Sequence, residues 1–209
     1  VYGKSEKAAV KEDDITEPIS PFGETVLAAE KMIKWFSQEN KITYALLRCF
    51  NQAGAHENGC IGSAHSPETH LVPNVMKTAA AQIPLLNIYG NDYETKDGTC
   101  IRDYVHVVDV AKAHVKAANY LIKSGESDVF NIGTGTGTSV AQICRAATKL
   151  TEMTIKSGTL GRRTGDAAHI IADTKKTEEV LMWRARRGVE EIIESAWKWH
   201  STHPFGYKT

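Results

Sequence analysis

Two arginines and their neighbours offer the chemistry that is easiest to deduce from this sequence. Arg102 is followed directly by Asp103, and Arg163 is followed three residues later by Asp166. Guanidinium groups on two separate loops could grip a diphosphate through bidentate hydrogen bonds, and Asn51 could add an amide donor. Taken singly, each arginine is more often the partner of a surface salt bridge. A diphosphate site is therefore a hypothesis that needs support from the surrounding residues.

The stretch from Asn87 to Ala111 supplies part of that support. It combines a short strand, two turns rich in Gly, Asn and Asp, and the Arg102 segment. Such a density of turn residues beside charged and aromatic side chains is typical of a binding wall rather than of core packing. Tyr89 stands at the end of the strand beside Gly90, where its ring could stack on a base.

Two other motifs are interpreted without a ligand. The glycines at 133, 135 and 137 have the spacing GxGxG rather than GxGxxG, which indicates a tight turn and not a dinucleotide fingerprint. His65, Glu68 and His70 lie in a polar loop without a further ligand at a metal-type spacing, so no metal site is predicted.

Composition excludes several classes of protein. Lys plus Arg and Asp plus Glu both number 25, so no charge excess points to nucleic acid or to an anionic membrane. No apolar run approaches the roughly 18 residues of a membrane span, and no signal peptide is recognisable. The four cysteines lack CxxC spacing and are interpreted as reduced thiols of a cytoplasmic protein. Because the chain begins at Val1 without Met, we expect a fragment, a processed product or a short paralogue.

The elements that must position these residues alternate between strands and helices. Ser20 before Pro21 is a helix start, and apolar residues then recur at helical spacing to about Asn40. Asp109 is expected to cap a later helix. The pattern predicts an α/β fold with parallel strands. Strands are expected at 44–48, 86–89, 129–132 and 153–156, and further helices at 71–82, from 109 onward, at 139–150, 174–181 and from 189 to 200.

Several segments resemble the UDP-galactose (UDP-glucose) 4-epimerase family of extended short-chain dehydrogenases, in the family's order and spacing. The segment from Leu46 to His56, LLRCFNQAGAH, resembles that family's LRYFNxxGA, and the resemblance covers essentially the whole chain. The other matching segments are THLVP at 69–73, NIYGNDY at 87–93, DGT at 97–99, RDYVHV at 102–107, FNIG at 130–133, RRTGD at 162–166, WKWH at 197–200 and HPFGY at 203–207.

The resemblance implies a fold and an activity. It implies an incomplete Rossmann-like parallel sheet, the remnant of an NAD-binding domain at 1–56, with 107–135 returning to that sheet. A smaller α/β UDP-sugar domain would occupy 57–209. Members use NAD to interconvert UDP-galactose and UDP-glucose. By position in the motifs, Asn51, Arg102 and Arg163 would hold the diphosphate. Tyr89 and the backbone around Asn87 would hold the uracil, and Asp166 the ribose. Leu71 would lie in the sugar-to-diphosphate segment, Ile170 beside the sugar and Cys49 near the nicotinamide.

The departures from the family concern the catalytic half. Phe22 and Val26 replace the tyrosine and lysine of YxxxK, four residues apart on one helix face. The NAD fingerprint is absent. We therefore expect a UDP-glucose 4-epimerase homologue that is truncated and inactive as this chain stands, and that does not bind NAD alone. The alternative is a non-catalytic nucleotide-sugar-binding or partner-binding module. The expected partners are a second copy of the chain, through helix 21–40, or an intact epimerase subunit.

Overall fold

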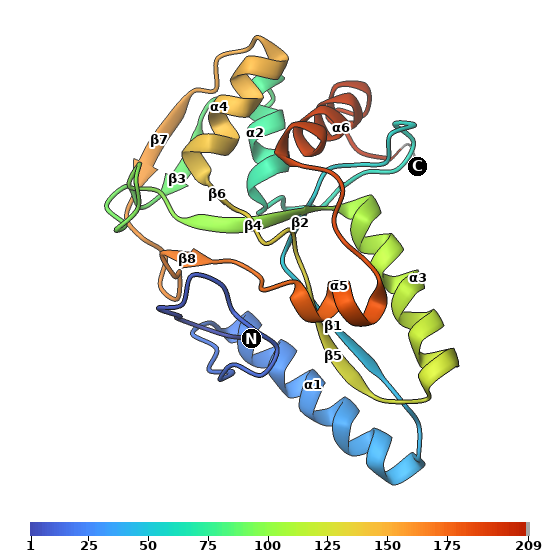
Figure 1. Cartoon of the computed structure of the whole chain (residues 1–209). Coiled ribbons are helices and arrows are strands. Elements are labelled where there is room, and N and C mark those ends of the chain that lie inside the picture. The colour runs from blue at the N-terminus through green and yellow to red at the C-terminus, as the bar shows by residue number, and fades with distance from the viewer. Residues whose placement is uncertain (208–209) are drawn as a thin grey trace.

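A computed structural model describes residues 1–207, in which the strands form three small sheets (Figure 1). Every neighbouring pair of strands runs parallel except β4 with β6, which confirms the predicted α/β class with parallel pairing. The strands are β1 (Ala45–Cys49), β2 (Asn51–Ala53), β3 (Leu86–Tyr89), β4 (Ile101–His106), β5 (Asp128–Ile132), β6 (Gly137–Ser139), β7 (Ser157–Leu160) and β8 (His169–Ile170). β4 contacts three partners, β2, β6 and β8, and is the centre of the largest sheet.

The first helix, α1 (Pro21–Asn40), has the predicted bounds. The Ser20 hydroxyl accepts a hydrogen bond from the Gly23 amide at 3.1 Å, and Pro21 occupies the first helical position. These two signals begin the helix because the cap satisfies a free amide and proline has none to satisfy. One face of α1 packs against the rest of the chain through Leu27 and Glu30, and the face turned away from it carries large exposed apolar side chains, among them Trp35 and Phe36.

A buried ion pair attaches α1 to β1. The Arg48 guanidinium donates to both carboxylate oxygens of Glu30 at 2.8 Å, and the two side chains are only 8% and 7% exposed. Its remaining nitrogen donates to the Tyr2 hydroxyl and to the Glu12 carbonyl oxygen at 3.0 Å each. Arg48 therefore ties the N-terminal loop, α1 and the β1–β5 sheet together.

The other helices form two groups, one around β3, β4 and β6 and one beside β1 and β5 (Figure 1). α2 (Leu71–Ala79), α4 (Val140–Thr151) and α6 (Val189–Thr202) enclose an apolar cluster that includes Met76, Ile143 and Ile192. α3 (Val107–Ser124) and α5 (Lys175–Leu181) cover the β1–β5 sheet around Phe130 and Trp183. No helix in the described part of the chain has the length and apolar character required to cross a bilayer.

Two sequence predictions are wrong in detail. α3 begins at Val107, and its cap is His106, whose Nδ1 accepts from the Val108 amide at 3.1 Å. Asp109 lies inside the first turn, where its buried carboxylate accepts from the Arg186 and Arg187 amides at 2.9 Å. Burial lowers the pKa of His106, which keeps this nitrogen free to accept.

The strand expected at 153–156 is displaced along the chain to β7, Ser157–Leu160. α4 extends to Thr151, and Glu152 adopts a left-handed conformation that ends it. β7 is mostly exposed and pairs only with β3, so its sequence lacks the apolar run that marks a buried strand.

Substituting Arg48 by methionine should lower the free energy of unfolding by about 3–5 kcal/mol, because Glu30 would remain as a buried charge without a partner. Urea denaturation measures the change. Lys7→Met is the matched control, since Lys7 pairs with Asp14 but is 63% exposed, and its loss should change the stability far less. Equal losses in the two variants would contradict the role assigned to Arg48.

Candidate functional site

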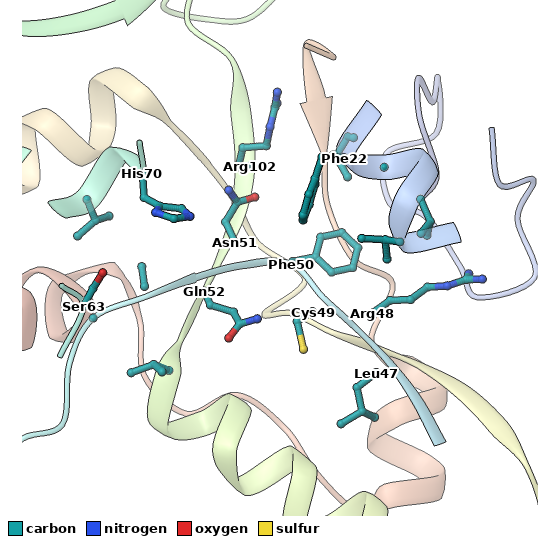
Figure 2. A pocket seen from close by; sticks show the side chains of 18 of the residues that line it. Phe22, Leu47, Arg48, Cys49, Phe50, Asn51, Gln52, Ser63, His70 and Arg102 are labelled. Carbon is teal, nitrogen blue, oxygen red and sulfur yellow. The ribbon is translucent and has the colours of Figure 1, made fainter. Parts of the chain in front are cut away.

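A cleft of about 1390 Å³ lies between α1, the β1–β2 segment, the loop before α2 and residues 165–170. It brings together most of the residues predicted for a site, although they are far apart in the sequence. Figure 2 shows Phe22, Asn51, His70 and Arg102 around this space. The predicted residues that line it are Phe22, Val26, Cys49, Asn51, Arg102, Asp166 and Ile170.

The direction of Arg102 follows from the alternation of side chains along β4. Arg102 faces the cleft, whereas the next residue, Asp103, points to the other face and is completely buried. The Asp103 carboxylate accepts hydrogen bonds from the Thr134 amide at 2.8 Å, the Thr134 hydroxyl at 2.7 Å, the Gly135 amide at 2.9 Å and the Ala172 amide at 3.2 Å. Asp103 thus holds the turn after β5 and the segment after β8 against the strand that carries Arg102.

This network explains the glycine run. A Cβ on Gly133 would lie 2.6 Å from the nearer Asp103 oxygen, and Gly135 has a φ of +72°. The turn therefore needs glycine to let the backbone approach the carboxylate and to adopt a left-handed conformation. The predicted tight turn is confirmed, and it leads into β6 and then α4.

The two arginines meet at one carboxylate. Arg102 Nη2 donates to Asp166 Oδ1 and Arg163 Nε donates to Asp166 Oδ2, both at 3.1 Å. The Arg163 guanidinium also lies over the Tyr89 ring, with its carbon 4.7 Å from the ring centroid. Arg102, Asp166, Arg163 and Tyr89 form a continuous row, which we call the arginine row.

The arginine row carries one net positive charge, because two guanidinium groups share a single carboxylate. Asn51 is adjacent in the fold, since β2 pairs with β4 in the register Asn51 to Tyr104. Gly165 brings Asp166 close to the start of α1: its φ is +82°, and a Cβ there would lie 2.3 Å from the Ile19 carbonyl oxygen. An anion with several oxygens would complete the charge balance of this surface.

Another part of the cleft wall is apolar. Phe22 is 79% exposed and projects from the first turn of α1, with Val26 one turn further along. Both side chains line the cleft with Phe50 and Ile170, and none of the four carries an ionisable group. Cys49 lies on the same wall, and burial raises the pKa of its thiol to about 11. The thiol is therefore protonated at neutral pH and is a weak nucleophile.

Four predicted residues stand outside the cleft lining: Tyr89 and Arg163, which belong to the arginine row, and Leu71 and Asn87. Leu71 is the first residue of α2 and packs against the core, although Val72 and Pro73 line the cleft. Asn87 is exposed on β3, two residues before Tyr89 and so on the same face of the strand. Sequence reasoning noted His65 and His70 as neighbours in one polar loop but did not place them on the cleft wall. His56 and His200 also line the cleft, and nothing in the sequence spacing indicates that the four histidines share a surface.

Comparison with known proteins decides the family. A family model described as GDP-mannose 4,6 dehydratase matches residues 1–196. The chain belongs to this family. It is 44% identical over 209 residues to a UDP-glucose 4-epimerase from Halalkalibacterium halodurans and 43% identical over 208 residues to one from Lactobacillus helveticus. Each match covers 99–100% of this chain and 63% of the relative, so the chain spans about two thirds of the relatives' length.

Solved structures of the family agree with the fold. A crystal structure of a UDP-glucose 4-epimerase superposes with a TM-score of 0.94 at 44% identity, covering all of this chain and 64% of that one. The Bifidobacterium longum UDP-glucose 4-epimerase, solved in complex with NAD+ and UDP, gives a TM-score of 0.91 at 35% identity, covering 99% and 62%. The resemblance to UDP-glucose 4-epimerases and the Rossmann-like α/β fold are thereby confirmed.

Replacing Asp103 by asparagine should lower the free energy of unfolding by about 2–3 kcal/mol, because an amide cannot accept from all four donors that now surround the carboxylate. Thr134→Val removes the hydroxyl that donates to Asp103 and accepts from the exposed Thr136 amide, and it should cost about 1 kcal/mol. Urea denaturation of both variants measures the difference. A loss in Asp103→Asn no larger than that in Thr134→Val would show that the network does not depend on the carboxylate.

Proposed function

We propose that this chain is a UDP-glucose 4-epimerase homologue that binds a UDP-sugar in the cleft but has no epimerase activity as it stands. The observation that carries the binding proposal is the arginine row, in which two guanidinium groups on separate segments share one carboxylate beside the cleft. The ligands of two related UDP-glucose 4-epimerase structures, UDP in one and formylated UDP-arabinopyranose in the other, support a nucleotide-sugar as the anion.

We assign the parts of a UDP-sugar to the residues of the arginine row and to their neighbours. Arg102 and Arg163 would donate to the diphosphate, with Asn51 as a further donor. Tyr89 and the backbone near Asn87 would bind the uracil, and Asp166 would bind the ribose while holding both arginines. The sugar would reach toward Ile170, and Leu71 would fix the start of α2 beside the diphosphate.

The catalytic end does not fit the family's chemistry. Phe22 stands where the family has a tyrosine, and a phenyl ring has no proton to exchange with a sugar hydroxyl. Val26 stands where the family has a lysine, and it can neither lower a neighbour's pKa nor bind a ribose. The wall around them is apolar, with Ala29, Ile33 and Leu47. Structures of relatives contain NAD, but Phe22 and Val26 offer neither the hydroxyl nor the ammonium group that the family places beside it, so hydride transfer by this chain is not expected.

We infer that residues 1–56 and 107–135 form the part equivalent to a nucleotide-binding domain and that the remainder of 57–209 forms the UDP-sugar domain. The cleft lies along this division, with α1 on one side and the segment before α2 on the other.

The four free thiols support a cytoplasmic location. The second candidate function, a partner-binding module, is favoured by the exposed apolar face of α1, which suits a homodimer or an intact epimerase subunit.

Isothermal titration calorimetry with UDP tests the binding proposal. The intact chain should bind one equivalent of UDP, and Arg163→Ala should weaken binding by at least tenfold, because a charge-assisted hydrogen bond contributes about 1.5–3 kcal/mol. Arg162→Ala is the control: the neighbouring arginine pairs with Asp92 and lies over Tyr93 instead of joining the row. Absence of heat with UDP, or equal affinity in Arg163→Ala, would refute the nucleotide site.

Turnover tests the second half of the proposal. With NAD added, the purified chain should convert no UDP-galactose to UDP-glucose beyond background, whereas an active UDP-glucose 4-epimerase assayed alongside converts it. Loss of a general base alone costs about 10²–10⁴ in rate. Any measurable conversion that scales with the concentration of this chain would contradict the assignment of Phe22 and Val26.

A further inference from the structure

Three donor side chains from one short loop converge on the cleft wall. His65, Glu68 and His70 each offer a ligand atom, and these atoms all lie within 4.8 Å of one another. Glu68 Oε1 lies 2.7 Å from His70 Nδ1, and Glu68 Oε2 lies 3.8 Å from His65 Nδ1. The two imidazole rings are tilted by 50° to each other, with centroids 4.8 Å apart. Both histidines line the cleft, and Figure 2 shows the His70 ring extending into it.

The loop holds the carboxylate in a fixed position. Glu68 Oε1 accepts from the Thr69 amide at 2.9 Å and from the His70 amide at 2.8 Å. The loop is anchored at one end by the Trp199 indole, whose Nε1 donates to the Ser63 carbonyl oxygen at 2.9 Å, and at the other by the start of α2. A donor set whose central member is already ordered loses little conformational freedom when it binds an ion.

The carboxylate is buried without a permanent cation. Its side chain is only 3% exposed, and within residues 1–207 its ion-pair partners are His65 and His70, with no lysine or arginine among them. A divalent cation between the two rings would place a permanent positive charge beside this buried carboxylate.

We propose that His65, Glu68 and His70 form a binding site for a divalent transition-metal cation of the zinc type. Two imidazoles and one carboxylate are a donor set that suits Zn²⁺, and metal–ligand bonds of about 2.0–2.2 Å place tetrahedral neighbours roughly 3.3 Å apart, within the range of separations in the loop. The exposed imidazoles can turn to equalise these separations. Three protein ligands leave a position open for water or a ligand oxygen on the cleft side.

This proposal departs from the sequence prediction of no metal site and is independent of the proposed UDP site. The sequence spacing suggested no further ligand, whereas the folded loop places the Glu68 carboxylate between the two rings. The Ser63 hydroxyl lies 2.9 Å from His65 Nδ1 and 3.4 Å from Glu68 Oε2. A cation bound between these two ligand atoms would displace the hydroxyl.

Cobalt and zinc titrations test the site. The full chain, without a histidine tag and freed of metal by a chelator, is titrated with Co²⁺ at pH 7.5 while the visible d–d absorption is recorded, and Zn²⁺ is then added to displace it. We expect one equivalent of Co²⁺ with the bands of a low-coordinate nitrogen and oxygen site. Glu68→Gln and His65→Ala should each raise the dissociation constant at least about tenfold, because outer-shell partners of a metal alone contribute 10–100-fold.

His114→Ala is the matched control, since His114 lies on α3 and bonds the Val110 carbonyl oxygen of its own helix. It should leave the Co²⁺ affinity unchanged. His65 is 61% exposed, so its replacement does not threaten folding, and circular dichroism checks Glu68→Gln. Absence of saturable Co²⁺ and Zn²⁺ binding by the wild-type chain, or unchanged affinity in the His65→Ala variant, overturns the proposal.

Discussion

The buried carboxylate of Asp103 is the interaction on which the arrangement of the cleft depends. It collects four hydrogen bonds from the turn after β5 and from Ala172 after β8, and it adds to the pairing of β6 and β8 with β4. A buried charge is tolerable only when hydrogen bonds replace its hydration. That requirement positions Arg102, because the residue beside an inward carboxylate on a strand must face outward.

Buried charges elsewhere serve the same purpose of joining segments that are distant in sequence. Arg48 and Glu30 attach α1 to β1, and Asp109 holds the chain before α6 through the amides of Arg186 and Arg187. These charges are saturated by their partners. The arginine row beside the cleft is not, because Asp166 balances only one of two guanidinium groups. A guanidinium group without a carboxylate partner of its own, next to a cavity, is stronger support for an anion site than the mere presence of several arginines.

Two parts of the cleft surroundings differ in chemistry. The polar part has arginine, asparagine and tyrosine side chains in contact or in neighbouring register. The apolar part includes Phe22 and Val26. The proposed function assigns ligand binding to the first group and treats the second as unable to transfer a proton, so that binding would not depend on turnover. Family membership by itself does not establish turnover for this chain.

The sequence alone determined the elements whose signals are local. Ser20 and Pro21 set the start of α1, and the strand at 86–89 follows from a short apolar run between turns. Only the tertiary structure decided which polar side chains meet. The cap at His106, the exposed strand β7 and the convergence of Glu68 with its histidines depend on partners far along the chain or on the path of a loop, for which sequence spacing carries no periodic signal.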